Sequence, residues 1–402
     1  MIELPLSGFR ILDFCWLIAG PLTTRLLADL GADVIKVESR ARLDRIREAG
    51  VQPPGRLSPD TNGVFNDCNT NKRSLTIDLN AAGAIDLIRA LVPTVDAVTS
   101  NFRPGRMQRW GLGYEDLRRI RPDIIVANLP AFGSGGPKTD WGIVGNGVVA
   151  MAGLNELTGF AERPPIGLGT LHSDFAAPYF AALSILAAFF DREQTGEGQC
   201  IELSQYEAAL NLLDTELLDY LGNGTEAKRA GNGSAEFVPH GVFRCAGEDR
   251  WVAIAARSTL EWQQLCAVMG RSDLALRHDL QSLAGRRLAE AEIERAISEW
   301  AAPRDVWEVA ATLEERQIPA SPVEDIGDLV ARDSGMRDYF VRFDHPEGID
   351  LLVQNEPILW DGERLPLQRA PLMGEHSQQV LSDLLDLDDE QIAHLVIDGV
   401  IY

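Results

Sequence analysis

Cysteine is scarce in this sequence of 402 residues, and the five that occur are far apart. No two of them form a CxxC pair, and no histidine lies near them at the spacing of a zinc ligand. This pattern excludes a disulfide framework and predicts no metal site. We therefore expect reduced thiols in a cytoplasmic protein.

Basic residues and long apolar runs are also few. The chain has 37 lysines and arginines against 60 acidic residues, and its net charge of −23 disfavours binding to nucleic acid or to an anionic membrane. The longest apolar run, residues 175–190, contains Pro178 and is shorter than the roughly 20 residues needed to cross a bilayer. Residues 1–20 carry Glu3, Arg10 and Asp13 and do not resemble an export signal. We expect no nucleic-acid or membrane partner.

The glycine fingerprint of dinucleotide-binding proteins is missing. After the first predicted strand the sequence reads CWLIAGP at residues 15–21, without the GxGxxG spacing, although Glu38 stands where a ribose-binding acid would lie. This favours an anionic nucleotide held by arginines over NAD or FAD.

What the sequence does contain is an alternation of short apolar runs and amphipathic stretches over its first 130 residues. Residues 10–14, 33–37, 75–79, 97–100 and 124–128 are predicted strands, and residues 21–30 and 81–91 are predicted helices. Such alternation predicts an α/β fold with a mostly parallel sheet, whose ligands bind beyond the carboxyl ends of the strands.

The length of the chain predicts two domains. Residues 222–234 contain four glycines and are predicted to be a linker, followed by a hairpin of residues 242–245 and 251–255 and then by helices to about residue 317. Proline and glycine return from about residue 322, and residues 378–397 form an acidic helical tail. The predicted division is a large domain from 1–221, a linker and small α+β domain from 222–322, and a return to the large domain in 323–402.

One basic segment stands out in this acidic chain. Residues 101–110, NFRPGRMQRW, hold three arginines and two aromatics at the end of a predicted strand. Arginines can pair with phosphate in a bidentate manner while an aromatic face stacks on a base. The alternative is an ordinary solvated loop. Lys72 and Lys138, which lie beside other predicted loops, are further phosphate candidates or simply surface charges.

Asp174 precedes the long apolar run, just after the GLGT of residues 167–170. A carboxylate at this place can be an N-cap that accepts hydrogen bonds from backbone N–H groups. Alternatively, it can be an ionised nucleophile that attacks an acyl thioester. The nearby His172 has no partner that suggests a Ser or Cys triad.

These segments resemble the class III (CaiB/BaiF) CoA-transferases in the same order along nearly the whole chain. The matching pieces include LSGFRILD at 6–13, LADLGADVIKVE at 27–38, NKRS at 71–74, NFRPG at 101–105, the Asp174 helix, TGEGQ at 195–199, IPASPV at 318–323 and APLMGEH at 370–376.

The resemblance implies a reaction in which Asp174 attacks an acyl-CoA and then carries CoA as an aspartyl thioester to an acceptor carboxylate. No cofactor is bound permanently, since the coenzyme A thioester is itself the substrate. The CoA contacts that the family implies fall on Arg40, Lys72, Asn101, Phe102, Arg109 and Lys138.

The family fold implies a Rossmann-like large domain built from both chain ends, a small middle domain, and two chains interlocked like linked rings. An interlocked homodimer is expected, or a heteromer with a related subunit. The glycine loop that gates some family members is not evident before Pro239, where AEFV stands at residues 235–238.

Two alternatives on the same fold remain open. An acyl-CoA racemase uses a histidine whose position falls near Val144 or Gly145, and neither residue can move a proton. The other alternative is a subunit of a heteromeric CoA-transferase. Residues 144–154 and 204–207 are closer to the benzylsuccinate type than to the formyl-CoA type. The sequence identifies neither the CoA donor nor the acceptor acid.

Overall fold

The computed structural model describes residues 4–49, 52–53, 55 and 58–402. The described chain divides into two compact units. The larger unit comprises residues 1–155, 167–226 and 338–402, and the smaller comprises residues 156–166 and 227–337. The sequence places the boundaries of the small domain at residues 222 and 322, and these domain boundaries remain a prediction. In the structure, chain segments pass between the units after residues 226 and 337, and residues 156–166 join the smaller unit.

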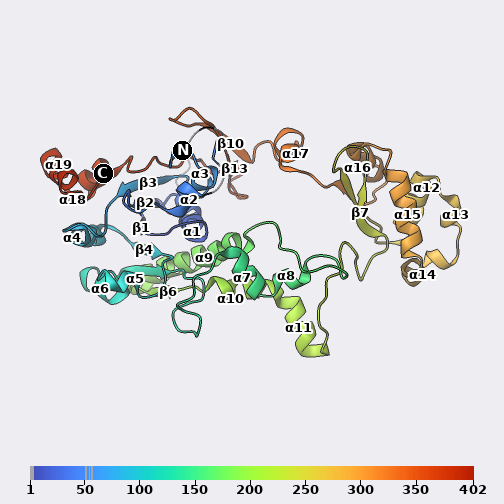
Figure 1. Cartoon of the computed structure of the whole chain (residues 1–402), viewed down its shortest axis with the longest axis horizontal. Coiled ribbons are helices and arrows are strands. Elements are labelled where there is room, and N and C mark those ends of the chain that lie inside the picture. The colour runs from blue at the N-terminus through green and yellow to red at the C-terminus, as the bar shows by residue number, and fades with distance from the viewer. Residues whose placement is uncertain (1–3, 50–51, 54, 56–57) are drawn as a thin grey trace. The chain divides into compact units, whose positions relative to one another are not determined.

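A six-stranded sheet forms the centre of the larger unit (Figure 1). Its order is β3-β2-β1-β4-β5-β6, and every pair is parallel. The strands are β1 (Arg10–Asp13), β2 (Asp33–Glu38), β3 (Lys72–Thr76), β4 (Ala97–Ser100), β5 (Ile125–Asn128) and β6 (Cys200–Glu202). This confirms the predicted α/β class, and the order reverses between β1 and β4, the position at which such sheets bind ligands.

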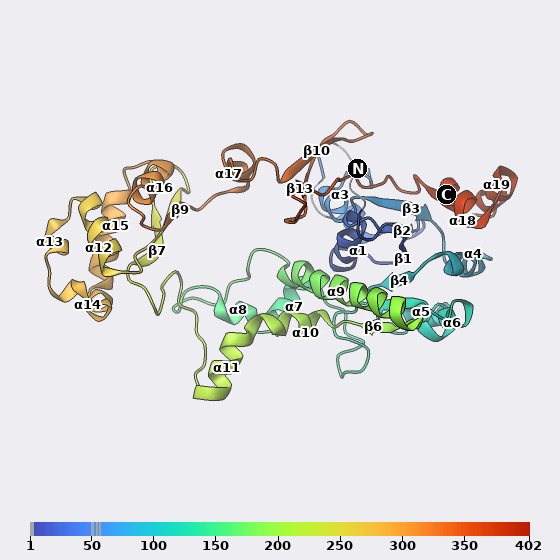
Figure 2. The same ribbon diagram turned by 180° about the vertical axis from the view of Figure 1, so that it is seen from behind.

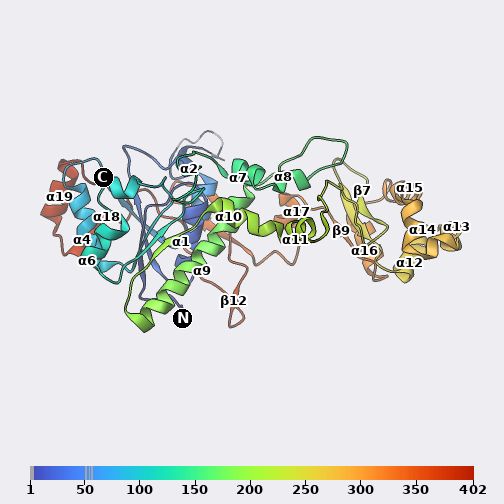
Figure 3. The same cartoon turned by 90° about the horizontal axis from the view of Figure 1, so that it is seen from below.

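Alternating side chains of the strands fill two cores, one on each face of the sheet. Leu12 and Ile35 point into one core, whereas their neighbours Ile11 and Val34 point into the other. The first core is covered by α4 (Ala84–Leu91), α6 (Tyr114–Ile120), α18 (Ser377–Leu385) and α19 (Asp389–Ile397). The second is covered by α1 (Ala19–Asp29) and α9 (His172–Thr195), which pack against each other (Figures 2 and 3).

Helix α9 is the one element among the described residues that is long and apolar enough to cross a membrane. Its buried residues, including Ala181, Ile185 and Phe189, pack in the second core of the sheet. It is therefore a core helix of the larger unit.

Shorter elements complete the larger unit. They are α2 (Arg45–Glu48), α3 (Gly63–Cys68), η1 (Val92–Thr94), α5 (Arg106–Arg109), α7 (Gly145–Met151), α10 (Gln205–Leu210), η2 (Asn211–Leu213), α11 (Asp214–Asn223), and the hairpins β10 (Phe340–Asp344) with β11 (Asp350–Gln354) and β12 (Leu359–Trp360) with β13 (Glu363–Arg364). Helix α8 (Leu154–Leu157) spans a boundary between the units. The C-terminus is tied to the sheet edge, because Ile401 bridges Ile77 and the Thr76 hydroxyl donates to the Tyr402 carbonyl.

The smaller unit has its own core beneath a three-stranded antiparallel sheet of β7 (His240–Arg244), β8 (Trp251–Ala255) and β9 (Ala320–Pro322). The predicted hairpin is thus confirmed as β7 and β8. The helices of this unit are α12 (Thr259–Met269), α13 (Ser272–Ala275), η3 (Asp279–Gln281), α14 (Leu283–Leu288), α15 (Glu290–Ala301), α16 (Val306–Glu314) and α17 (Ile326–Ala331).

Candidate active site

Asp174 lies in the first turn of α9, and its position decides between the two interpretations of this residue. Leu171 occupies the N-cap position of α9, and its side chain makes no capping hydrogen bond. Asp174 itself is inside the helix, with its backbone N–H donating to the Leu171 carbonyl at 2.8 Å. The capping alternative is therefore wrong, because an N-cap residue precedes the first helical residue.

The Asp174 carboxylate is half-buried against the backbone of Gly145. A Cβ at Gly145 would lie 2.8 Å from Asp174 Cγ, closer than van der Waals contact allows. The adjacent Ser173 hydroxyl donates to the Gly145 carbonyl at 3.2 Å and holds the start of α7 against α9. Glycine is thus required here for the close approach of the backbone to the carboxylate.

Burial without a charged partner raises the pKa of Asp174 to about 6. No hydrogen bond or ion pair to its carboxylate is found within the described part of the chain. By contrast, the half-buried carboxylates of Asp96 and Asp123 pair with Arg121. A perturbed carboxylate without a structural partner is typical of a functional site.

A second cluster lies beyond the carboxyl ends of β1 and β4. The Phe102 ring is in edge contact with Trp16 and with Trp110, at centroid distances of 5.4 and 5.8 Å. Asn101 fixes this arrangement, because its side chain accepts from the backbone N–H of Trp16 at 2.8 Å and donates to the Trp16 carbonyl at 2.7 Å. The predicted residues Asn101 and Phe102 thus meet on an aromatic surface.

Two arginines lie over these aromatic rings, and a third, Arg109, is close enough to one of them to affect its charge. The Arg42 guanidinium lies 5.6 Å from the Trp16 ring centroid, and that of Arg106 lies 4.4 Å from the Trp110 ring centroid. Desolvation, Arg109 and Arg42 together lower the pKa of Arg106. No acidic partner of these three arginines is found among residues 4–49 and 58–402. We call Arg42, Arg106 and Arg109 the arginine cluster, and its unbalanced charge suits a polyphosphate.

The remaining predicted contacts are placed differently. Arg40 is exposed between β2 and α2. Lys138 is half-buried, and its ammonium lies 5.6 Å from the Trp141 ring and 5.4 Å from the Tyr206 ring. Both cations can reach an anion from these positions.

Lys72 is at odds with its predicted role as a phosphate contact. Lys72 is the first residue of β3 and does not belong to a loop. Because it pairs with Val34 in the sheet, its side chain is directed beneath α1. Its buried ammonium donates to Pro21 O at 2.8 Å and Asn69 Oδ1 at 2.9 Å, and it lies 3.3 Å from Asp13 Oδ2. All its donors are used internally, so the structure gives it a packing role.

Arg42, Arg106 and Trp16 were not among the predicted contacts. The signal was present for Arg106, which belongs to the basic segment 101–110. For Trp16 a weaker signal was present, because it directly follows the first predicted strand, at the end where ligands of such sheets bind. For Arg42 no local signal was present, because only the parallel register of β1, β2 and β4 brings these loops together. No cluster of three metal-ligating side chains is found in the portion of the chain that the structure describes.

Comparison with known proteins extends over nearly the whole chain. The family model described as CoA-transferase family III matches residues 6–377. The succinyl-CoA–D-citramalate CoA-transferase of Chloroflexus aurantiacus is 31% identical and aligns over 99% of this chain and 98% of its own. The formyl-CoA:oxalate CoA-transferase of Streptomyces avermitilis is also 31% identical, over 98% and 99%. A solved CAIB/BAIF family protein from Brucella suis, 28% identical, covers 95% of this chain and 100% of its own with a TM-score of 0.87.

Proposed function

The chain belongs to CoA-transferase family III, and from that membership we propose that its class III CoA-transferase activity proceeds through Asp174. The observation that carries the proposal is the Asp174 carboxylate itself, which is half-buried, lacks a partner in the described structure, and lies against Gly145. Desolvation makes a carboxylate more basic and more reactive toward an acyl carbon.

The proposed reaction needs no redox partner and no net proton transfer. An Asp174 oxygen attacks the acyl carbon of the donor, the C–S bond breaks, and CoA leaves as a thiolate. The thiolate then attacks the Asp174 carbonyl carbon of the mixed anhydride, which releases the donor acid and leaves an aspartyl-CoA thioester. The acceptor carboxylate repeats these steps in reverse and restores Asp174.

For CoA we propose the arginine cluster with its aromatic surface as the binding site. Arg109, Arg42 and Arg106 are positioned to pair with phosphate oxygens, while Phe102 and the tryptophans offer faces or edges to the adenine. Asn101 acts as a positioning residue through Trp16. Arg40 and Lys138 are additional cations for the anionic substrate, whereas the Lys72 ammonium is bound inside the larger unit.

We propose that the active form is an interlocked homodimer in the cytoplasm. Exposed apolar side chains support a large protein contact, since Leu183 and Phe190 of α9 are 66% and 71% exposed and Leu218 and Leu221 of α11 are 68% and 70% exposed. A heteromer with a related chain is the alternative outcome. The likeness to the benzylsuccinate type stays a prediction from residues 144–154 and 204–207.

Racemisation is not favoured by this site. The candidate positions are Val144, which is exposed, and Gly145, which touches the carboxylate, and neither side chain can carry a proton.

Trapping of the thioester tests the proposal directly. Wild-type enzyme incubated with an acyl-CoA and hydroxylamine should yield a hydroxamate on the peptide that contains Asp174, detected by mass spectrometry. Asp174→Asn should fold yet give no adduct and no transfer, because an amide cannot form the anhydride. Near-normal transfer by a folded Asp174→Asn variant would contradict the mechanism. A screen of acyl-CoA donors against carboxylic acids, also read by mass spectrometry, identifies the substrates.

A further inference from the structure

The loop after β1 contains an uncommon backbone conformation at Leu17. Its φ is +65°, in the left-handed region. The other non-glycine residues with positive φ in the described parts of the chain are all Asn, Asp or Gln. This conformation costs a leucine free energy, because its Cβ approaches the following carbonyl oxygen. The Leu17 side chain is 39% exposed, so its burial does not offset that cost. An outlier of this kind indicates a functional constraint.

A buried carboxylate holds Leu17 in this conformation. The Leu17 N–H donates to Asp44 Oδ1 at 3.0 Å. The Asp44 side chain is fully buried, and its Oδ2 lies 3.3 Å from the ammonium of Lys36, which is also fully buried. Lys36 in turn donates to the Cys15 carbonyl at 2.6 Å. The two members of one ion pair thus bind the backbone on both sides of Trp16.

The same carboxylate fixes the neighbouring loop between β2 and α2. Asp44 is the N-cap of α2 and accepts from the Ile46 N–H at 3.2 Å. Arg42, two residues earlier, lies over the Trp16 ring. Asp44 therefore joins the loop that carries Trp16 to the loop that carries Arg42. Asn101 makes the corresponding connection to the loop after β4.

Stability alone does not account for this arrangement. The backbone groups of a surface loop can bond to water instead. A buried ion pair is also often no more stabilising than apolar side chains of the same volume. The Lys36–Asp44 pair is therefore better explained by the loop geometry that it imposes.

We propose that Asp44 is a positioning residue for coenzyme A, because it holds Leu17 in the left-handed conformation. Trp16 is thereby kept next to Phe102 and Arg42, where the nucleotide of coenzyme A binds. This role rests on the CoA site proposed above, but it requires no turnover at Asp174.

Isothermal titration calorimetry of the full-length chain with free coenzyme A tests this role. Asp44→Ala should raise the Kd about tenfold or more, the loss expected for a hydrogen bond to a charged group. Asp44→Asn keeps an acceptor oxygen for the Leu17 N–H and should restore most of the affinity. Asp388→Ala is the matched control, since it removes the N-cap of α19 in the same unit and should leave the Kd unchanged.

Substitutions of Leu17 separate backbone positioning from a simple apolar contact. Asn adopts the left-handed conformation readily, whereas the β-branched side chain of Val disfavours it. Leu17→Asn should therefore bind coenzyme A more tightly than Leu17→Val, although Val is the more apolar. Asp44→Ala should raise the Kd by only about threefold or less in the Leu17→Asn background, because the conformation then depends less on the carboxylate.

An unchanged Kd in Asp44→Ala, or binding by Leu17→Val as tight as that of Leu17→Asn, would overturn the role of Asp44. Thermal melting shows whether each variant is folded, and if Asp44→Ala is not, the comparison at Leu17 decides alone. Arg109→Ala separates this role from the proposed site. Weaker binding by Arg109→Ala but not by Asp44→Ala would contradict the role of Asp44 alone, whereas normal binding by both would contradict the CoA site as well.

Discussion

At the scale of single residues, Asp174 shows a conflict between activity and stability. Its pKa of about 6 lies above the ordinary value of 3.8, so the folded state holds the proton more tightly than the unfolded chain does. The carboxylate therefore lowers the stability of the folded protein as pH rises through about 6. The feature that suits it for attack on an acyl group is the one that costs folding free energy.

Asp174→Asn should accordingly raise the free energy of unfolding at pH 8, by an amount on the order of 1–3 kcal/mol, while abolishing transfer. At pH values below 3.8 the two proteins should be equally stable, because the carboxyl is then protonated in both states. Urea unfolding at several pH values measures the difference. In the wild type, kcat/KM should rise through about pH 6 and then level off, since only the ionised form attacks. A variant that is less stable at pH 8 would show that the carboxylate has a structural partner.

Arg109 and Lys72 make a matched pair, because both were predicted to contact phosphate but only Arg109 is free to do so. Arg109→Ala should raise the KM for the acyl-CoA about tenfold or more, with little change in stability. Lys72→Ala should instead destabilise the protein by about 3–5 kcal/mol, since it removes the ion-pair partner of the buried Asp13 carboxylate.

Steady-state kinetics and chemical denaturation separate the two effects. An effect of Lys72→Ala on KM without loss of stability would restore that residue to the binding site, and an unchanged KM in Arg109→Ala would remove Arg109 from it.

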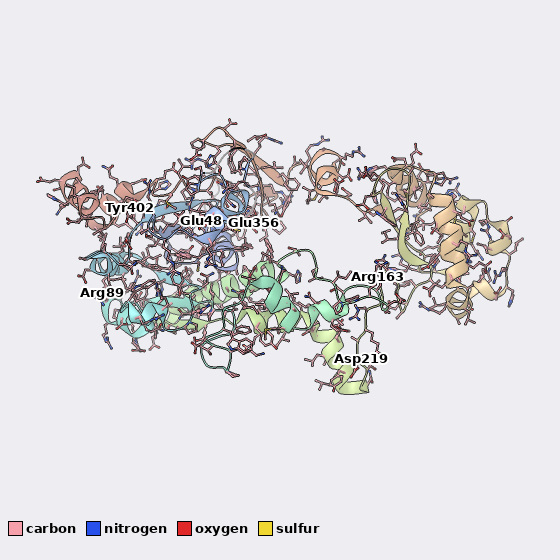
Figure 4. All side chains as sticks on the ribbon, in the orientation of Figure 1. Glu48, Arg89, Arg163, Asp219, Glu356 and Tyr402 are labelled. Atoms are coloured by element: carbon pink, nitrogen blue, oxygen red, sulfur yellow. The ribbon has the colours of Figure 1, made fainter. Side chains whose placement is uncertain are left out.

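At the scale of elements, the segment that follows β11 places a second buried carboxylate in the larger unit, and its negative charge is only partly balanced by a nearby arginine. Glu356 (Figure 4) lies 3.6 Å from the Arg25 guanidinium, which also contacts Asp29 and Asp67. Burial raises the pKa of Glu356 to about 7, because one arginine does not balance three acids.

A carboxyl whose pKa is raised on folding adds stability below its ordinary pKa of 4.5, and this contribution is lost as pH rises through about 7. Glu356→Gln should therefore lose less stability than the wild type between pH 5 and pH 8. Thermal unfolding followed by circular dichroism across this range measures it. Glu48→Gln, at an exposed position (Figure 4), serves as the control and should follow the wild type. If the stability of the wild type and of Glu356→Gln changed with pH in the same way, the raised pKa of Glu356 would be contradicted.

The sequence predicted most strands of the central sheet, because alternation of apolar residues reports burial directly. It placed the third strand at 75–79, whereas β3 runs from Lys72 to Thr76. The charges of Lys72 and Arg73 indicated a loop, yet these side chains pair with Asp13 of β1 and Asp33 of β2. Such partners are distant in sequence, so no local pattern reveals them. For the same reason the sequence predicts Asp174 and Phe102 as site residues but gives no sign of Arg42.

At the scale of the whole molecule, the proposed interlocked dimer has a consequence that ordinary dimers lack. Linked chains cannot separate without unfolding, so the dimer should persist at low nanomolar concentration. Mass photometry after extensive dilution should show one species at twice the chain mass of 44.1 kDa. Native mass spectrometry distinguishes two identical chains from a heteromer. A folded monomer on dilution would exclude the interlocked arrangement.

The attachment of residues 338–402 to the central sheet also sets an order of events during synthesis. Val380, Ile392 and Ile401 belong to the same core as Leu12 and Ile35, and Ile401 bridges Ile77 beyond the end of β3. A ribosome that has made residues 1–337 has therefore delivered every strand of the parallel sheet, together with α4 and α6, but not the part of the cover on that face that α18 and α19 supply. The smaller unit can finish folding on the nascent chain at that point, while the larger one, with its active-site candidates, still needs residues 338–402.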